Sequence, residues 1–209
     1  MNKETFDTLF VYGTTQQRLQ DWHWCIDKIE STNPKIVIEI GVFTGGSLRF
    51  WEHIVPSDGV IIGVDNVPQP IYYDWNKNGN VKLVNGDSTK IETAIEVENI
   101  LNNKKADFLL IDGGHLTLDG GIPERDFNNF APLVKIGGLI CVADLGADCA
   151  SNVFLSLPNP KETEPHAGMG FWTKTQEVEI QACNGSDKGA CERMLKLFHS
   201  SYGGHPKHG

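Results

Sequence analysis

The sequence lacks any apolar run that is long enough to cross a membrane. Of its 209 residues, 40% are hydrophobic and 22% are charged, and no apolar stretch approaches the roughly 18 residues that a spanning helix needs. The first twenty residues are polar and mixed, and they do not contain the apolar segment of a signal peptide. These absences predict a protein without a membrane segment that works in the cytoplasm.

Cysteine is also scarce, and it follows no metal-binding pattern. The sequence has five cysteines, which is an odd number, and no two of them are spaced as Cys-x-x-Cys. A structural zinc site or a framework of disulfide bonds is therefore not expected, and this usage is typical of proteins in a reducing compartment.

The chain has no excess of basic residues. Lys and Arg number 18 against 27 Asp and Glu, which gives a formal net charge of −9. Nonspecific binding of nucleic acid or anionic lipid depends on clustered positive charge. We therefore expect neither nucleic acid nor membrane among the partners of this protein.

Short apolar runs alternate with helical stretches over the first two thirds of the chain. Strands are predicted at residues 36–40, 59–65, 81–87, 106–112 and 137–144, and helices at residues 16–30, 46–54, 90–103 and 125–134. Buried strands that alternate with helices predict βαβ units and a parallel sheet. With an antiparallel closing pair predicted at residues 177–183 and 193–200, the expected fold is α/β: a doubly wound, mostly parallel seven-stranded sheet with helices on both faces.

The length of the chain suits one domain, residues 1–209. Residues 1–32 are expected to form a helical segment that leads into the first strand. Residues 145–175 contain three prolines and have poor periodicity, which predicts an irregular insertion over the rim that the strand ends form. Residues 200–209 are expected to form a mobile tail.

An acid and three glycines surround the end of the first predicted strand, in the stretch KIVIEIGVFTGGSLRFW (residues 35–51). Gly41, Gly45 and Gly46 let the backbone turn tightly and let a ligand approach it closely, because no Cβ intrudes. The order Glu39-x-Gly41-x-x-x-Gly45-Gly46 differs from the Gly-x-Gly-x-x-Gly of dinucleotide binders. A carboxylate before the first glycine would repel a pyrophosphate, and it would attract a cation such as the ammonium group of an amino acid.

A carboxylate is the last residue of each of the other four predicted strands, whereas Glu39 stands just before the last residue of the first. The four terminal residues are Asp65, Asp87, Asp112 and Asp144. In doubly wound sheets ligands bind beyond the carboxyl ends of the strands, so all five acids should converge on one rim. An alternative interpretation is that some of them only cap helices or shape turns.

Three of these acids match the parts of one small molecule. Glu39 offers a carboxylate to an ammonium group, Asp65 can accept hydrogen bonds from both hydroxyls of a ribose, and Asp87 stands where it would meet the edge of a purine. An amino acid joined to an adenosine is the chemistry of S-adenosylmethionine. The pattern therefore predicts S-adenosylmethionine as the cofactor.

The chain resembles the class I S-adenosylmethionine-dependent methyltransferases over residues 33–144. The matching segments are IEIGVFTGGSL (38–48), GVIIGVDN (59–66), VNGDST (84–89), LLIDGGH (109–115) and LVKIGGLICVAD (133–144). More narrowly, it resembles the branch that contains the cephalosporin hydroxylase-like and the macrolide-sugar and rhamnosyl O-methyltransferases. The resemblance implies a Rossmann-like methyltransferase fold, an S-adenosylmethionine cofactor, and the hydroxyl of a small molecule such as a sugar or natural product as the acceptor.

The resemblance also implies a set of cofactor-binding residues and a rim where the reaction takes place. The cofactor-binding set is Glu39, Gly41, Gly45, Gly46, Ser47, Asp65, Asn66, Asp87, Ser88 and Asp112. Asp112 and His115 are expected to be catalytic, with His115 as a base for the acceptor hydroxyl. Similar metal-dependent enzymes hold Mg²⁺ by an acid after the fourth strand and a pair after the fifth. This implicates Asp112 and Asp144, but Leu145 departs from the pair, and a metal-free reaction stays open.

Three functions are compatible with the sequence. An O-methyltransferase of a small hydroxylated molecule fits the motifs. An NAD-dependent oxidoreductase on a Rossmann sheet is the first alternative, against which the acid before Gly41 counts. A non-catalytic, cofactor-binding relative is the second, because a fold alone does not fix activity. The sequence does not identify the acceptor molecule. It does not define the oligomeric state either, and a homodimer is one alternative.

Overall fold

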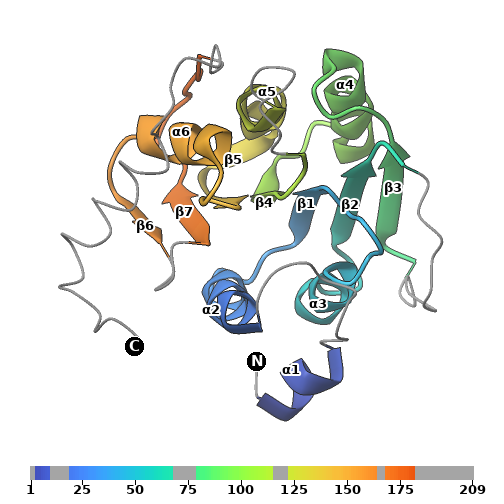
Figure 1. Cartoon of the computed structure of the whole chain (residues 1–209). Helices are drawn as coiled ribbons and strands as arrows, with labels where there is room; N and C mark the ends of the chain where they lie inside the picture. Colours follow the sequence, from blue (N-terminus) through green and yellow to red (C-terminus); the bar gives the residue numbers. More distant parts are fainter. Residues whose placement is uncertain (1–2, 10–18, 68–78, 115–121, 164–167, 182–209) are drawn as a thin grey trace, which may run out of the picture.

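The structure is a computed structural model, and it describes residues 3–9, 19–67, 79–114, 122–163 and 168–181. Its centre is a seven-stranded sheet in the order β3-β2-β1-β4-β5-β7-β6 (Figure 1). The strands are β1 (Ile36–Ile40), β2 (Val60–Asp65), β3 (Val81–Asn85), β4 (Ala106–Ile111), β5 (Val134–Ala143), β6 (Lys161–Thr163) and β7 (Met169–Thr173). The first five strands run parallel, and β7 is antiparallel to both β5 and β6. The predicted mostly parallel, seven-stranded sheet is confirmed.

The position of the last two strands was predicted wrongly. Residues 145–175 are not an irregular insertion, because they contain the helix α6 (Asp148–Ser156) and both β6 and β7. Residues 177–181, which were predicted to begin a strand, are not in one. The other predicted strand, at residues 193–200, and the predicted tail lie outside the described residues. The closing pair therefore comes some twenty residues earlier in the chain than its apolar patterns suggested.

Helices cover both faces of the sheet (Figure 1). The helices α2 (Leu19–Glu30) and α3 (Leu48–Ile54) lie on one face, with α1 (Lys3–Leu9) packed on their outer side. The helices α4 (Ile91–Leu101), α5 (Ile122–Phe130) and α6 lie on the other face, with a short 3-10 helix, η2 (Ala131–Leu133), after α5. In the part of the chain that the structure describes, no helix has the length and apolar character that crossing a bilayer requires.

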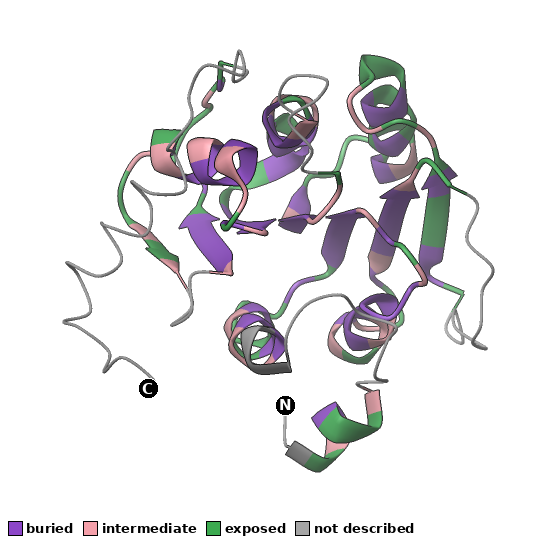
Figure 2. Cartoon of the chain, in the orientation of Figure 1, coloured by how far each residue is buried: buried purple, intermediate pink, exposed green. Residues whose placement is uncertain are grey.

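The two faces of the sheet carry separate apolar cores. Every residue of β1 is buried, as expected of a central parallel strand with helices on both sides (Figure 2). Alternation along the strand sends Ile38 and Ile40 into the core beneath α4, α5 and α6, and Val37 into the core beneath α1, α2 and α3. The second core is rich in aromatic rings, and Trp51 packs edge-on against Phe108 with 5.5 Å between ring centroids.

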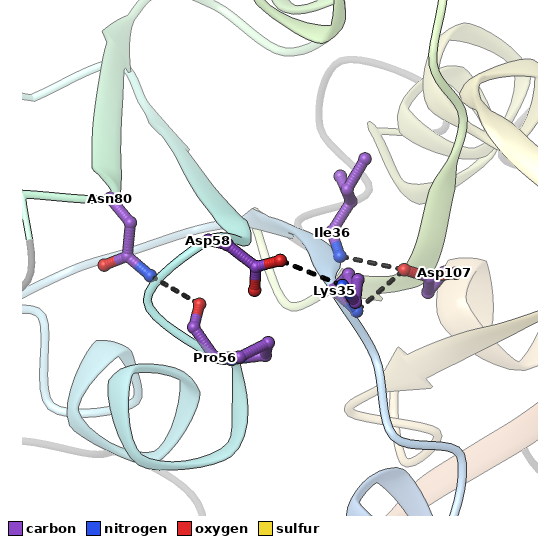
Figure 3. Close-up of polar contacts among 6 residues, drawn as sticks. All are labelled: Lys35, Ile36, Pro56, Asp58, Asn80 and Asp107. Carbon is purple, nitrogen blue, oxygen red and sulfur yellow. Dashed lines mark hydrogen bonds and ion pairs between the residues drawn. The ribbon is translucent and has the colours of Figure 1, made fainter.

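A polar network fastens the amino ends of the strands (Figure 3). One carboxylate oxygen of Asp107 in β4 accepts hydrogen bonds from the backbone N–H groups of Lys35 and Ile36, both at 2.8 Å, and the other accepts one from the Lys135 ammonium at 2.5 Å. Nearby, Lys35 forms an exposed ion pair of 2.9 Å with Asp58. This edge, which we call the amino edge, thus joins β1, β4 and β5 through the carboxylate of Asp107.

Candidate active site

A pocket of about 360 Å³ opens at the opposite edge, where the parallel strands end. We call this the carboxyl edge. The pocket is lined by the ends of β1 and β2, by the loops that follow β1, β2, β3 and β4, and by Ile122 at the start of α5. Of the residues predicted to bind the cofactor, it brings together Gly41, Asp65, Asn66, Asp87, Ser88 and Asp112. Its lining, as far as the structure describes it, holds three aspartates and contains no Lys or Arg.

The turn after β1 is held in a conformation that requires glycine. Gly41 has a φ of +89°, and a Cβ at this position would overlap the backbone carbonyl of Asp112 and stand 2.8 Å from the Cα of Gly113. The glycine therefore lets the β1 and β4 loops pack directly against each other. Phe43, two residues later, also has a positive φ of +49°, an uncommon conformation for a bulky residue. The turn is thus strained at the wall of the pocket.

Asp65 fixes this turn from the end of β2. One of its carboxylate oxygens accepts a hydrogen bond from the backbone N–H of Phe43 at 2.8 Å, and the other accepts one from Val67 at 2.9 Å. A carboxylate oxygen has two acceptor sites, so each oxygen can still accept from a ligand. The structure therefore places Asp65 in the lining of the pocket and shows that its carboxylate also holds the glycine turn.

Asp87 begins the loop after β3. A single carboxylate oxygen accepts hydrogen bonds from both the backbone N–H of Thr89, at 2.9 Å, and the Thr89 hydroxyl, at 2.6 Å. Chiefly the hydroxyl bond lowers the pKa of Asp87, so that it is ionised at neutral pH. Asp87 therefore has the turn-forming role that the sequence left open, and together with Ser88 it lines the pocket.

Glu39 does not face the pocket, which contradicts the expected contact with an ammonium group. It is 1% exposed, and its carboxyl group accepts hydrogen bonds from the Ser47 hydroxyl and, at 2.6 Å, from the indole N–H of Trp51 in α3. Burial raises its pKa to about 7, although both hydrogen bonds act to lower it. Glu39 lies one residue before the end of β1, so its side chain points into the α3 face of the sheet.

The other residues of the predicted glycine turn also lie away from the pocket. Gly45, Gly46 and Ser47 are buried, and none of them lines the pocket as the structure describes it. Gly45 has a φ of +81°, which explains its glycine by backbone conformation. Ser47 bonds Glu39 and begins α3. These residues therefore shape the turn from behind.

The predicted reacting rim is described only in part. Asp112 follows β4 and lines the pocket, as expected, whereas the predicted base His115 lies outside the described residues. Asp144 follows the neighbouring strand β5 and has a φ of +54°. Among the described residues, no group of three or more His, Cys, Asp or Glu side chains is arranged to hold a metal ion.

Sequence reasoning missed several residues around the pocket. Phe43, Val67 and Ile122 supply apolar lining, and the first two are exposed large side chains, at 41% and 51%. Asp126 of α5 was missed as well, although its carboxyl group is fully buried close to Gly113. Apolar residues close to a strand-end acid, such as Val67 after Asp65, were a signal that the sequence offered. An acid within a helix is usually on the solvent face, so Asp126 gave no such signal.

A family model described as "Methyltransferase domain" matches residues 38–145, slightly more than half of the chain. None of the curated protein sequences is similar enough to the chain to count as a match.

Two solved structures show the same fold. One is the MycE methyltransferase from the mycinamycin biosynthetic pathway, solved with Mg, SAH and mycinamycin VI: TM-score 0.59, 17% identity, 89% of this chain and 55% of that chain covered. The other is an O-methyltransferase from Bacillus cereus solved with SAH: TM-score 0.59, 13% identity, 82% of this chain and 90% of that chain covered. The chain therefore spans only about half the length of the MycE structure.

Proposed function

This chain belongs to the methyltransferase-domain family, and on that premise we propose that it transfers a methyl group from S-adenosylmethionine to a hydroxyl of a small molecule. The observation that carries the proposal is the pocket at the carboxyl edge, where Asp65 and Asp87 face a cavity whose described lining contains no basic side chain. The MycE and Bacillus cereus structures, which share the fold and hold SAH, support the choice of cofactor. The Bacillus cereus protein is an O-methyltransferase, which supports a hydroxyl as the acceptor.

The chemistry of the pocket fits this cofactor. S-adenosylmethionine carries an ammonium group and a positively charged sulfur, and carboxylates attract both. Asp65 can accept from ribose hydroxyls with the acceptor sites that the turn leaves open, and the loop of Asp87 and Ser88 offers polar groups to the base. Phe43 and Val67 supply apolar surface to its rings. Because Glu39 is buried, we leave it and the glycines behind the turn out of the binding set.

The residues of the chain would act mainly by positioning. S-adenosylmethionine supplies the electrophile, a methyl group on a charged sulfur. Asp65 holds both the ribose and the strained turn, which fixes the nucleoside relative to the end of β4. Asp112 lies at that end, on the wall of the pocket. The acceptor hydroxyl loses its proton, for which His115 stays the predicted base. If His115 has this role, His115→Ala should lower turnover more than it lowers the affinity for S-adenosylhomocysteine.

A divalent metal fits the described residues only in part. Mg²⁺ prefers oxygen ligands, and Asp112 and Asp144 end neighbouring strands. The described part of the chain does not add a third ligand to this pair. Binding of Mg²⁺ by Asp112 and Asp144 therefore stays a prediction, and no step of the reaction is assigned to it. Activity that survives chelation by EDTA would rule out a required metal.

The compartment and the partner follow from the same proposal. The cysteines that the structure describes, Cys25, Cys141 and Cys149, are buried free thiols. Free thiols are typical of a reducing compartment, which supports the expectation that the enzyme acts in the cytoplasm on a small-molecule acceptor.

Thermal unfolding with added ligands tests the proposal. S-adenosylhomocysteine should raise the melting temperature of the protein, because it binds the folded state only, and NAD should not. A transfer assay with methyl-labelled S-adenosylmethionine and a panel of sugars and hydroxylated natural products should then give a labelled product. Stabilisation by NAD alone would favour the oxidoreductase. Bound S-adenosylhomocysteine without transfer to any acceptor would favour a non-catalytic binding protein.

A further inference from the structure

The loop after β3 lines the pocket from the edge of the sheet. All four of its residues 86–89 line the pocket, and each of them is half-buried or exposed. In the described sheet, β3 is an edge strand that pairs with β2. The loop after β1, by contrast, lies between neighbours and packs against the backbone of the β4 loop. The loop after β3 therefore depends on other contacts to keep its shape.

Side chains of two helices hold successive backbone carbonyls of this loop. The Thr93 hydroxyl of α4 donates a hydrogen bond to the carbonyl of Asp87 at 2.7 Å. The side-chain amide of Asn129 of α5 donates one to the carbonyl of Ser88 at 2.9 Å. Thr93 is 7% exposed and packs directly on Gly86, where an added Cβ would stand 2.7 Å from the hydroxyl oxygen. Neither Thr93 nor Asn129 lines the pocket, so both reach the loop from behind.

The two bonds differ in what their loss would leave. The carbonyl of Asp87 also accepts a hydrogen bond from the backbone N–H of Lys90 at 3.0 Å, so it keeps one partner without the Thr93 hydroxyl. For the carbonyl of Ser88, the donor that the described residues provide is Asn129. Loss of the Asn129 amide should therefore release the loop further than loss of the Thr93 hydroxyl.

A hydrogen bond from a helix to the loop favours one loop conformation over the others that an exposed loop can adopt. The apparent affinity of a ligand falls in proportion to the fraction of molecules whose loop is in the binding conformation. Removing a bond that exists only in that conformation lowers the fraction, by at most about 10-fold for a typical neutral hydrogen bond. Ligand affinity therefore reports on side chains that the ligand does not touch.

We propose that Thr93 and Asn129 are positioning residues, which hold the loop of Asp87 and Ser88 in the conformation that receives the ligand. The inference rests on the proposed function, because it takes the ligand to be S-adenosylmethionine in the pocket at the carboxyl edge. Both residues act through backbone carbonyls of the loop. Their effect therefore does not depend on which part of the ligand the loop contacts.

Asn128, the residue before Asn129 on α5, provides a matched control. Its side-chain amide donates a hydrogen bond to the backbone carbonyl of Ile180 at 2.7 Å, and its side-chain oxygen accepts one from the backbone N–H of Ile180 at 2.8 Å. Asn128 thus holds the chain after β7 and not the loop after β3. Asn128→Ala removes two hydrogen bonds from the same helix, so it should lower stability more than Asn129→Ala does.

Isothermal titration calorimetry with S-adenosylhomocysteine, combined with urea unfolding, tests the proposal. Asn129→Ala should bind the ligand about 3- to 10-fold more weakly than the wild type, and Thr93→Val about 2- to 3-fold more weakly. Thr93→Ser keeps the hydroxyl group and loses a buried methyl group, so it should lower stability and keep the affinity. Asn128→Ala should also lower stability and keep the affinity.

Hydrogen exchange of the loop gives a readout that needs no ligand. The backbone N–H of Thr89 donates a hydrogen bond to the Asp87 carboxylate within the loop at 2.9 Å. In the free protein this N–H should exchange faster in Asn129→Ala and in Thr93→Val than in the wild type, because the loop opens locally. Asn128→Ala should leave its exchange unchanged.

The outcomes separate the inference from the function beneath it. Wild-type affinity in Asn129→Ala or in Thr93→Val overturns the role of that residue. A loss of affinity in Asn128→Ala as large as in Asn129→Ala shows that these bonds act only through the stability of the fold. In both cases the proposed function stands, because the wild type binds S-adenosylhomocysteine. Should Asn129→Ala not fold, the comparison of Thr93→Val with Thr93→Ser decides. Only a wild-type protein that does not bind the ligand removes both proposals.

Discussion

The two edges of the sheet use the same residue type in opposite ways. At the amino edge, Asp107 accepts from the backbone N–H groups of Lys35 and Ile36 (Figure 3). It also accepts from the Lys135 ammonium. At the carboxyl edge, Asp65 also accepts from two backbone N–H groups, but it lines a pocket whose described lining contains no Lys or Arg. An aspartate neutralised by a lysine holds strands together, whereas one facing a cavity without a counter-charge is available to a cationic ligand. The difference lies in the charge around each carboxylate.

The largest difference between the two edges is expected when a glycine at each edge is replaced by alanine. We expect Gly41→Ala to lower the free energy of unfolding by about 3 kcal/mol or more. The cost of a positive φ for alanine and the cost of the overlap between its Cβ and the β4 loop add together. It should also abolish measurable binding of S-adenosylhomocysteine. Gly137 in β5 is the matched control, with a φ of +84° and no atom within 4 Å of an added Cβ. Gly137→Ala should cost only about 1–2 kcal/mol. Equal losses in denaturant unfolding would contradict the packing role of Gly41.

Replacing one aspartate at each edge by alanine should show that only the carboxyl edge binds S-adenosylhomocysteine. We expect Asp65→Ala to weaken S-adenosylhomocysteine binding about 10- to 100-fold, because hydrogen bonds to a charged group contribute about 1.5–3 kcal/mol each. Asp58→Ala makes the same change at the amino edge and removes only an exposed ion pair. It should leave the calorimetric affinity unchanged. Matching losses in the two variants would show that general charge, and not the pocket, controls binding.

For Asp107 at the amino edge, we expect replacement to lower stability and to leave cofactor affinity unchanged. Its replacement by Ala should lower the free energy of unfolding by about 2–3 kcal/mol, because the backbone N–H of Ile36 loses its acceptor in a partly buried setting. The affinity for S-adenosylhomocysteine should not change. Urea unfolding and calorimetry on one preparation measure both quantities. An Asp107→Ala protein as stable as the wild type, or one with a clear loss of affinity, would contradict the claim that the amino edge stabilises the fold and the carboxyl edge binds the ligand.

The smallest effect is expected in the pH dependence of stability. Burial raises the pKa of Glu39 to about 7 from 4.5, so its contribution is fully favourable below about pH 4.5 and is lost as the pH rises toward 7. The buried Asp126 acts in the same direction. At the amino edge the sign is opposite. Burial acts to raise the pKa of Asp107, but Lys135 and the two backbone N–H groups lower it more, so its contribution is lost as the pH falls below 3.8.

Glu39→Gln should therefore flatten the fall in stability between pH 5 and pH 7 without removing it. Between about pH 5 and pH 7, the free energy of unfolding of the wild type should fall by about 1–2 kcal/mol more than that of the variant. This is less than a full slope of about 1.4 kcal/mol per pH unit would give over the two pH units. Urea unfolding at several pH values measures it. Parallel curves for the two proteins would show that Glu39 is ionised throughout and that its burial does not hold a proton.

The first five strands and three of their terminal acids were predictable because two simple rules applied. Apolar, β-branched runs such as residues 36–40 mark strands that helices bury on both faces. Asp65 ends β2, Asp87 and Asp112 follow β3 and β4, and the parallel sheet brings such positions together. The closing strands were misplaced because β6 has only three residues and stands among prolines, so the pattern of β7 was not recognised.

The role of Glu39 was predicted wrongly because side-chain direction alternates along a strand. A shift of one residue from the strand end turns its carboxyl group from the edge into the core between β1 and α3. The predicted strand, residues 36–40, ends where β1 ends, so the error lay in the direction assigned to the side chain and not in the strand boundary. Asp126 was missed for a different reason: only the packing of α5 against the sheet reveals that this acid is buried.

A crystal structure of the protein with S-adenosylhomocysteine tests the central claim most directly. The claim predicts the nucleoside in the pocket at the carboxyl edge, with its ribose hydroxyls bonded to Asp65 and its base beside Asp87 and Ser88. A nucleoside bound anywhere else on the chain, with this pocket filled by protein side chains, would contradict it.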